Sequence, residues 1–414
     1  MYDDDRVTTV LDSQSAPGAS RLFGVADDLS GACEVAGALG GPGAVVLLAD
    51  RGLGPDAVRV AVADTDSRYA DARTAETVTA AALAGLPPET DLFVKVDSLL
   101  RGNVAAVTRA ATALGRPVVL AVALPENSRV VRDGVPIVGG LPLHATGLWR
   151  AELRPPPRTV QEALDDEPAE VVPLDVVRDP DRLRSRLELL ARRGRVAIVD
   201  AVEPRDLDLV VETAWRNTAG PRAVLLGSGG LAAAVGRSSG RTLRSALPEP
   251  GGAAPLVVVG SGSDAARRQF ARLVTEVECV VVELDAARLL AAPAEAAGTL
   301  SAALRGRQQL PTAVRLEWTG DLRIDHGPEV TRALATAVGQ AVADSGGDRP
   351  LTLIGGATAR GVLDRLGVRR LTVLGTLTAG AVASRTDAGT TIVTRPGGFG
   401  NDAHLIDILR TMSG

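Results

Sequence analysis

The stretch "DLFVKVDSLLRGN", residues 91–103, places an ammonium, a carboxylate, a hydroxyl and a guanidinium close together. Lys95 is the only lysine of the chain, and every other cationic side chain apart from the histidines is an arginine. A lysine at a solvated sheet edge is the alternative interpretation, but such a lysine could have become arginine like the others, whereas a compact ammonium in a tight pocket could not. Side chains alternate along a strand with period two, so Lys95 and Asp97 share a face. We predict a site made by Lys95, Asp97, Ser98, Arg101 and Asn103.

A pair of adjacent carboxylates stands in "GVADDLSGACE", residues 24–34. Asp27 and Asp28 end a predicted strand, and Ser30 opens a predicted helix. In doubly wound sheets, ligands bind outside the carboxyl ends of the strands, where a reactive carboxylate would be placed. One aspartate could instead cap the helix. We predict that Asp27 or Asp28 is a general base, with Asp97 as the next candidate.

A glycine turn in "VVVGSGSDAARRQ", residues 257–269, fits the dinucleotide pattern G-x-G-x-x-A through Gly260, Gly262 and Ala265. Glu283 or Asp285 would be its acidic partner. Backbone amides at a helix N-terminus would hold the phosphates of ATP or ADP equally well. An NAD-dependent oxidoreductase therefore remains an alternative.

Two further glycine turns, "LIGGATARGV" and "VTRPGGFGND", also follow predicted strands. Three such turns behind strands of one domain could cradle a polyphosphate and let a ribose or base approach the backbone. The P-loop sequence is absent. The predicted nucleotide site comprises Ser261, Gly262, Ser263, Gly355, Gly356, Gly397 and Gly398.

The elements that must position these residues alternate between short apolar runs and Ala- and Arg-rich stretches of helical length, which predicts a parallel α/β architecture. Two apolar runs around Gly139 and Gly140 predict a hairpin over residues 134–143. A Pro- and Gly-rich stretch over residues 245–255 is the predicted linker, and the α/β alternation begins again after it.

The composition excludes several classes of protein. The net charge is −5 and aromatic residues make up 2% of the chain, which argues against a nucleic-acid surface. Such a chain must fill its interior with Ala, Val and Leu.

Cys33 and Cys279 form no CxxC pair and are expected to be reduced thiols. No apolar run is long enough for a membrane span, and the acidic start is unlike a signal peptide, so we expect a cytoplasmic protein without membrane partners. The three histidines show no metal-ligand spacing, and the metal ligands remain unknown.

At these residues the chain resembles the four-carbon acid sugar kinase family, whose members phosphorylate acids such as threonate, erythronate and 3-oxo-tetronate with ATP. "ADDLSGA" and "ADTDSR" match two of the family's motifs, and "KVDSLLRGN" is similar to a third. The later pieces "GSGGLA", "GSGS", "IGGATA" and "RPGGFG" follow in family order. The family's last motif usually begins with lysine where this chain has Arg395, Thr376 stands where the family tends to carry glutamate, and "PENSR", residues 125–129, departs from P-x-x-G-R.

The resemblance implies an N-terminal domain that binds the sugar acid and a C-terminal domain that binds the nucleotide. It also implies that Ser261, Ser263, Gly355, Gly356 and Gly398 contact ATP. We therefore predict a disordered tail over residues 1–20, an acid-binding domain over 21–246 and a nucleotide-binding domain over 253–414. Each domain is expected to be a largely parallel sheet flanked by helices, with the active-site cleft between them.

The predicted activity is transfer of a phosphoryl group from ATP, with Mg²⁺ bridging the phosphates, to a hydroxyl of a small sugar acid. Arg68 and Arg101 suit the carboxylate of the acid, because a guanidinium binds it through two hydrogen bonds. A sensor that binds a sugar acid without catalysis is a second alternative. The sequence does not fix which acid or which hydroxyl reacts, and a homodimer is among the assemblies it allows.

Overall fold

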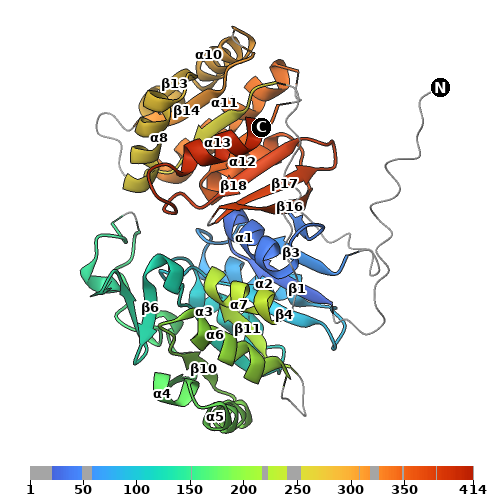
Figure 1. The fold of residues 1–414 in the computed structure, drawn as a ribbon, viewed down its shortest axis with the longest axis vertical. Coiled ribbons are helices and arrows are strands. Elements are labelled where there is room, and N and C mark those ends of the chain that lie inside the picture. Colours follow the sequence, from blue (N-terminus) through green and yellow to red (C-terminus); the bar gives the residue numbers. More distant parts are fainter. Residues whose placement is uncertain are drawn as a thin grey trace, which may run out of the picture.

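The computed structural model describes residues 21–48, 58–150, 152–216, 222–239, 253–306, 308–317, 326–346, 349–378 and 380–413. The predicted tail over residues 1–20 and most of the predicted linker lie outside these ranges. In Figure 1 the N-terminal half, in blue and green, occupies the lower part of the molecule and the C-terminal half, in yellow and red, the upper part.

The N-terminal half is built on a parallel sheet with the strand order β2-β3-β1-β4-β11-β5-β10-β9. Its strands are β1 (Leu22–Ala26), β2 (Val45–Leu47), β3 (Val60–Asp64), β4 (Asp91–Lys95), β5 (Val118–Ala121), β9 (Ala169–Val172), β10 (Val196–Val199) and β11 (Val224–Gly227). Its α-helices are α1 (Leu29–Gly40), α2 (Ala72–Leu83), α3 (Val104–Thr112), α4 (Leu174–Val177), α5 (Pro180–Arg192), α6 (Pro204–Val211) and α7 (Gly229–Ser238).

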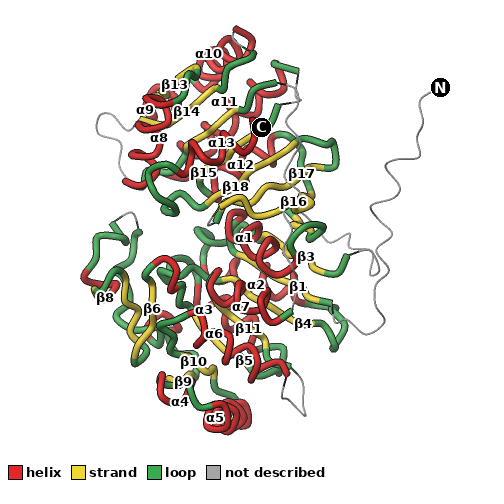
Figure 2. Tube along the Cα trace, viewed as in Figure 1, coloured by secondary structure: helices red, strands yellow, loops and turns green. Residues whose placement is uncertain are grey.

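A separate small sheet, seen to the left of this half in Figure 2, contains the predicted hairpin. The hairpin strands β7 (Val135–Val138) and β8 (Leu141–Pro142) pair antiparallel, as the two glycines between them predict. A third strand, β6 (Arg129–Arg132), was not predicted and pairs with β7.

The C-terminal half is a mixed sheet with the strand order β13-β14-β12-β15-β18-β17-β16, in which β16 and β17 run antiparallel to their neighbours. Its strands are β12 (Leu256–Val259), β13 (Val280–Asp285), β14 (Thr312–Glu317), β15 (Leu351–Ile354), β16 (Arg370–Thr378), β17 (Ala381–Thr386) and β18 (Thr391–Arg395). Its helices are α8 (Asp264–Glu276), α9 (Ala286–Ala291), α10 (Pro293–Gly306), α11 (Gly327–Asp344), α12 (Gly356–Arg365) and α13 (His404–Ser413).

The two sheets are joined edge to edge, which the sequence did not predict. Strand β2 pairs antiparallel with β16 through Val45, Val46 and Leu47, so that one sheet of 15 strands runs through both halves. The backbone bond from Val373 N to Ala44 O is 2.8 Å long. Helix α1 packs against β16 and α12 of the C-terminal half as well as α7 of its own half. A continuous sheet therefore links the two halves of the chain.

The core consists largely of Ala, Val and Leu, as the composition requires. Phe93 and Phe270 are its largest fully buried apolar side chains, one in each half. Because small side chains let helices approach a sheet closely, they suit the parallel architecture. Cys33 is buried, Cys279 is partly exposed, and both thiols are free.

Candidate functional site

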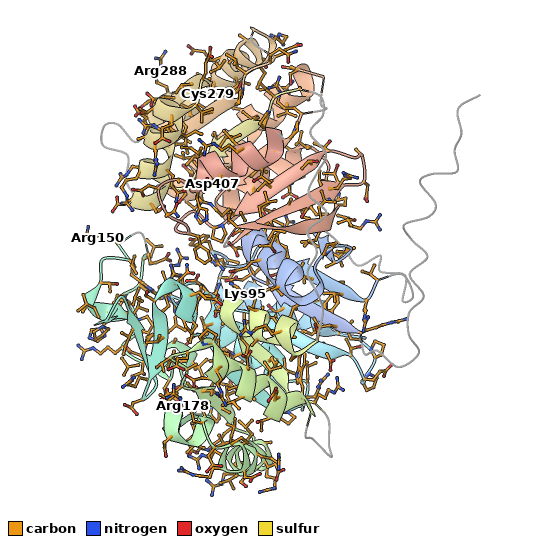
Figure 3. All side chains as sticks on the ribbon, in the orientation of Figure 1. Lys95, Arg150, Arg178, Cys279, Arg288 and Asp407 are labelled. Atoms are coloured by element: carbon orange, nitrogen blue, oxygen red, sulfur yellow. The ribbon has the colours of Figure 1, made fainter. Side chains whose placement is uncertain are left out.

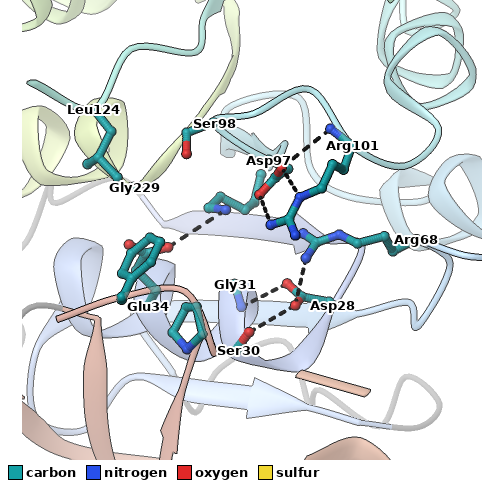
Figure 4. A pocket seen from close by; sticks show the side chains of 13 residues that line it. Asp28, Ser30, Gly31, Glu34, Arg68, Asp97, Ser98, Arg101, Leu124 and Gly229 are labelled. Carbon is teal, nitrogen blue, oxygen red and sulfur yellow. Dashed lines mark hydrogen bonds and ion pairs between the residues drawn. The ribbon is translucent and has the colours of Figure 1, made fainter. Parts of the chain in front are cut away.

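A pocket lies where the carboxyl ends of β1 and β4 meet the turn that follows β18, so both halves of the chain line it. Figure 3 shows Lys95 at this level of the molecule, and Figure 4 shows the pocket from close by. Its free volume is about 20 Å³, which is about the space of one water molecule. The lining residues are Asp28, Ser30, Gly31, Glu34, Arg68, Lys95, Asp97, Ser98, Arg101, Leu124, Gly229, Pro396 and Phe399.

Arg68 binds both predicted aspartates at the end of β1. Its guanidinium donates to Asp27 Oδ1 at 2.6 Å and Oδ2 at 2.9 Å, and it lies 2.8 Å from Asp28 Oδ2. Asp28 also caps α1, because its Oδ1 accepts from Gly31 N at 2.9 Å, and its Oδ2 accepts from Ser30 Oγ at 2.8 Å. The capping alternative is therefore correct for Asp28, although this residue also lines the pocket.

These contacts act on the two carboxyls differently. Burial raises the pKa of Asp27 despite the neighbouring Arg68. Burial also opposes ionisation of Asp28, but Arg68 and Lys95 hold its pKa below the ordinary value. Asp28 is thus an ionised carboxylate with both oxygens engaged.

Lys95 is buried at the end of a central strand, with 5% of its surface exposed. Strand β4 lies between β1 and β11, which excludes the alternative of a solvated lysine at a sheet edge. The ammonium lies 3.7 Å from Glu34 Oε2, and this ion pair is drawn in Figure 4. Gly229 lies against Glu34, and a Cβ atom there would overlap the carboxylate.

Asp97 is bound by Arg101 through two hydrogen bonds of 2.7 and 2.9 Å. The backbone amides of Leu99 and Arg101 also donate to Asp97 Oδ2, at 3.2 and 3.3 Å. Burial alone would raise the pKa of Asp97, but the charge and the side-chain hydrogen bonds of Arg101, together with the charges of Arg68 and Lys95, hold it far below its ordinary range. A carboxylate held in this way is a weak proton acceptor.

Ser98 links the pocket to a residue that was not in the predicted site. Its Oγ accepts a 2.6 Å hydrogen bond from Arg129 Nη1, and the Arg129 guanidinium lies 5.2 Å from the centre of the Phe399 ring. Phe399 belongs to the last glycine turn, so Arg129 connects the N-terminal half to that turn. Asn103 is outside the pocket lining and donates to the carbonyl oxygens of Ser67 and Ala70 at 3.0 and 2.9 Å. It fixes the loop that carries Arg68.

The three predicted glycine turns follow the adjacent strands β12, β15 and β18. Ser263 caps α8 and donates from its Oγ to Gly397 O at 2.8 Å. Gly397 packs against Ser261, and a Cβ atom at residue 397 would overlap the Ser261 side chain. Gly355 has φ 107°, which favours glycine, and lies near the backbone nitrogen of Ser261. The turns therefore touch one another, as the prediction of a common cradle requires.

Gly356 joins this cradle to the acid side of the pocket. A Cβ atom at Gly356 would overlap Asp28 Oδ2 and would lie 2.9 Å from Ser30 Oγ. Gly262 and Gly398 differ, because a Cβ atom at either position would meet nothing within 4 Å. The space above these two glycines is open to a bound group.

Two of the three departures from the family pattern, Arg395 and Thr376, lie away from the pocket lining. Arg395 is fully buried and donates to Phe399 O at 2.6 Å and to Gln269 Oε1. Burial lowers its pKa to about 10. Arg395 therefore braces the last glycine turn. Thr376 lies on β16 against Gly37 of α1, where a Cβ atom on the glycine would be 3.0 Å from Thr376 Oγ1.

The alternative dinucleotide site does not have the required geometry. In such sites the acidic residue ends the strand beside the glycine turn. Here both candidate acidic residues, Glu283 and Asp285, lie on β13. Strand β14 separates β13 from β12, the strand that precedes the glycine turn. Glu283 pairs with Arg315 at 2.7 Å, and Asp285 caps α9 through Arg288 N at 2.8 Å.

Sequence reasoning assigned no role to several residues at or beside the pocket, among them Glu34, Arg129, Gly229 and Phe399. Glu34 could have been found, because it follows Ser30 by one helical turn and so shares its helix face. Gly229 and Phe399 stand inside motifs that were recognised without roles. The contact between Arg129 and Phe399 joins residues 270 positions apart and gives no local signal.

Within the ranges that the structure describes, no group of three or more His, Cys, Asp or Glu side chains is arranged to hold a metal ion. In the same ranges, no helix is both long enough and apolar enough to cross a membrane.

Two family models match the chain in sequence. A sugar-binding N-terminal domain matches residues 22–235, and a nucleotide-binding C-terminal domain matches residues 256–405. A D-threonate kinase from Cupriavidus necator is 36% identical over 262 residues, covering 60% of this chain and 62% of that protein. A D-threonate kinase from Salmonella typhimurium is 32% identical, covering 66% of each chain, and a 3-oxo-tetronate kinase from Methylobacterium radiotolerans is 30% identical, covering 64% and 66%. The matches thus span somewhat less than two thirds of the length of these relatives.

Solved structures share the fold. A Salmonella typhimurium LT2 protein described as a tRNA synthase superposes with a TM-score of 0.77 at 23% identity, covering 94% of this chain and 99% of its own. A Haemophilus influenzae protein of the family DUF1537 gives a TM-score of 0.67 at 19% identity, covering 95% and 100%. At these identities the likeness concerns the architecture alone.

Proposed function

Because this chain belongs to the four-carbon acid sugar kinase family, we propose that it transfers the γ-phosphoryl group of ATP to a hydroxyl of a small sugar acid. The observation that carries the proposal is the contact of Gly356 with Asp28 and Ser30. It joins the glycine turns, which suit a nucleotide, to a pocket of charged side chains, which suits a polar acid. Phosphoryl transfer needs such a junction, since it depends mostly on positioning and charge stabilisation.

The nucleotide is proposed to bind over the turns after β12, β15 and β18. The N-termini of α8 and α12 supply backbone amides for its phosphates. The open space above Gly262 and Gly398 suits the approach of a ribose or phosphate to the backbone. Ser261, Ser263, Gly355, Gly356 and Gly397 complete this proposed site.

The acid is proposed to bind among the cations on the other side of the pocket. Arg68 and Arg101 were the predicted anchors for its carboxylate, but each already binds an aspartate of the protein. A substrate carboxylate would have to share these guanidinium groups. Arg129 has no carboxylate partner among the described residues, since its contacts are Ser98 and the Phe399 ring. We therefore add Arg129 to the proposed anchors.

Lys95 is proposed to lie close to both substrates. Its ammonium stands between the acid side and the turn that carries Phe399, and both residues line the pocket. A single compact charge can centre on one oxygen, as stabilisation of charge developing on a phosphoryl oxygen requires. Because the pocket has a free volume of only about 20 Å³, side chains must move to admit the substrates.

Mg²⁺ is proposed as the usual companion of ATP. The pocket carboxylates Asp28 and Asp97, and Asp27 beside the pocket, are paired with arginines. The described residues therefore offer few free oxygen ligands, and phosphate oxygens would hold most of the ion's coordination sphere. When bound, the ion would neutralise part of the negative charge of the phosphates.

The direct test is to incubate the pure protein with Mg²⁺, ATP and a panel of four-carbon acids that includes D-threonate, D-erythronate and 3-oxo-tetronate, and to follow ADP release. ADP formed only with one or more acids supports the proposal. Acid binding without turnover would favour a sensor, and hydride transfer with NAD in place of ATP would favour the oxidoreductase.

A further inference from the structure

Four carboxylates lie at or beside the pocket, and three of them are held by arginines. Arg68 binds Asp27 and Asp28, and Arg101 binds Asp97 through both of its oxygens. The guanidinium partners hold the pKa values of Asp28 and Asp97 below their ordinary range, which makes both poorer proton acceptors, whereas burial raises the pKa of Asp27. None of these three aspartates offers a free oxygen to an acceptor hydroxyl, because both oxygens of each already accept from donors of the protein.

Glu34 is the fourth carboxylate and is held differently. Among the residues that the structure describes, its ionic partner is Lys95 at 3.7 Å, and no arginine pairs with it. Its side chain keeps 14% of its surface exposed, and it lines the pocket. Glu34 lies on α1, and the dashed line at its carboxylate in Figure 4 marks its ion pair with Lys95.

The surroundings reserve space for the Glu34 carboxylate. A Cβ atom at Gly229 would overlap it, so the glycine at the start of α7 leaves room for the Glu34 carboxylate in its present position. Pro396 and Phe399, from the last glycine turn, line the same pocket. Glu34 therefore lines the same pocket as the last glycine turn and the cations of the proposed acid site.

The charged groups around Glu34 tune its basicity. Burial raises its pKa above the ordinary value, Lys95 and Arg129 oppose that rise, and Asp28 and Asp97 reinforce it. A carboxyl with a raised pKa accepts a proton more readily, while the adjacent ammonium favours the ionised form that can accept one.

We propose that Glu34 is the general base of the phosphoryl transfer, a role that rests on the proposed kinase function. As the acceptor hydroxyl oxygen forms its bond to the γ-phosphorus, its proton passes to a carboxylate oxygen of Glu34. The bond between the γ-phosphorus and the β–γ bridging oxygen breaks, and the electron pair leaves with ADP. The proton then passes from Glu34 to solvent, which restores the carboxylate. Asp27 and Asp28 are assigned instead to holding Arg68.

The test compares Glu34→Gln with the full-length wild type at saturating ATP and acid. The amide keeps the size of the side chain and cannot accept the proton, so kcat should fall by about 10²–10⁴-fold with the affinities for ATP and acid largely kept. The wild-type rate should fall at low pH as Glu34 becomes protonated, and the pH–rate profile of the variant should lack this low-pH limb.

Glu76→Gln is the matched control and should keep wild-type rates. Glu76 lies on α2 in a half-exposed pair with Arg109.

Glu34→Asp provides a second variant if the glutamine form folds poorly. It keeps a carboxylate but shortens its reach, and it should retain part of the rate and the low-pH limb. Near-normal kcat in Glu34→Gln would overturn the proposal, as would an unchanged low-pH limb or a defect that excess Mg²⁺ restores. If the wild type itself phosphorylates no acid in the panel, the proposed kinase function fails. If the wild type is a kinase but its rate does not depend on Glu34, only the role of Glu34 fails.

Discussion

Arg360 Nη1 lies 3.0 Å from Asp64 Oδ2 and forms an ion pair that joins the two halves of the molecule. The Asp64 side chain has no exposed surface, and Arg360 has a second partner in Asp364 at 3.0 Å. Asp64 ends β3 just before the loop that carries Arg68, and Arg360 lies on α12, which begins at Gly356. The pair therefore fixes the proposed acid site relative to the proposed nucleotide site.

Removing Arg360 should destabilise the protein more than removing the charge of Asp64. Arg360→Gln leaves a fully buried carboxylate without its cation, which typically costs about 3–5 kcal/mol. Asp64→Asn leaves Arg360 paired with Asp364 and should cost less. Thermal or denaturant unfolding of both variants measures the difference, with the exposed-pair variant Arg370→Gln as a control near wild type. Equal losses would contradict the asymmetry.

The stability of Arg360→Gln should depend on pH in a defined direction. Burial raises the pKa of Asp64 to about 7, and Arg360 opposes that rise. Between the unfolded pKa of 3.8 and the folded pKa, the folded state binds more protons than the unfolded state, so stability falls as pH rises. Without Arg360 the fall should be larger and should extend above pH 7. Melting temperatures at about pH 6 and about pH 8.5 test this, and a drop no larger than that of the wild type would contradict it.

Lys95→Arg should preserve folding and lower kcat/KM for the acid at least about tenfold, roughly 1.4 kcal/mol of transition-state stabilisation. Lys95 is buried, and the Cβ position of Gly31 lies only 3.4 Å from its Nζ. A guanidinium is wider than an ammonium and cannot centre on one oxygen. Thermal melting and steady-state kinetics measure both effects. Wild-type kinetics in Lys95→Arg would mean that any positive charge at position 95 is sufficient for the reaction, whatever the shape of the group that carries it.

Gly398→Val and Gly356→Ala should separate binding from folding. The Cβ position of Gly398 is open, so the valine should leave stability and acid binding unchanged and weaken ATP binding at least about tenfold, because it fills space proposed for the nucleotide. Alanine at position 356 would overlap Asp28 and should reduce stability as well. Calorimetric titration with ATP and thermal melting test the pair. Full ATP affinity in Gly398→Val would place the nucleotide elsewhere.

Arg129→Lys should raise KM for the acid by about tenfold with a smaller effect on kcat. Lysine keeps the charge but loses the two-pronged geometry and the stacking on Phe399. Arg132→Lys is the matched control, because Arg132 lies on the same strand and is exposed. An unchanged KM in Arg129→Lys would remove Arg129 from the proposed anchors.

The sequence predicted the parts of the site that depend on strand ends. Asp28, Lys95 and the three glycine turns follow short apolar runs, and the carboxyl ends of parallel strands gather at one edge of a sheet. The same local patterns predicted most of the strands and the hairpin. These features need only the order of elements along the chain.

The pairing of side chains could not be predicted in this way. Arg68 and Asp27 are 41 residues apart, and their contact follows from the adjacency of β1 and β3, which periodicity does not reveal. The arginines expected to bind a substrate carboxylate instead hold carboxylates of the protein. The pairing of β2 with β16 was missed for the same reason, since each strand has an ordinary apolar pattern.

The junction of β2 with β16 has a consequence for how the chain is made. Strand β16 begins about 320 residues after β2 ends, so at about 5–20 residues per second a ribosome would complete it tens of seconds later. During that interval the N-terminal sheet would carry an unpaired edge at β2, which is a surface prone to pairing with other chains. The N-terminal sheet therefore gains the partner of its β2 edge only after β16 has emerged.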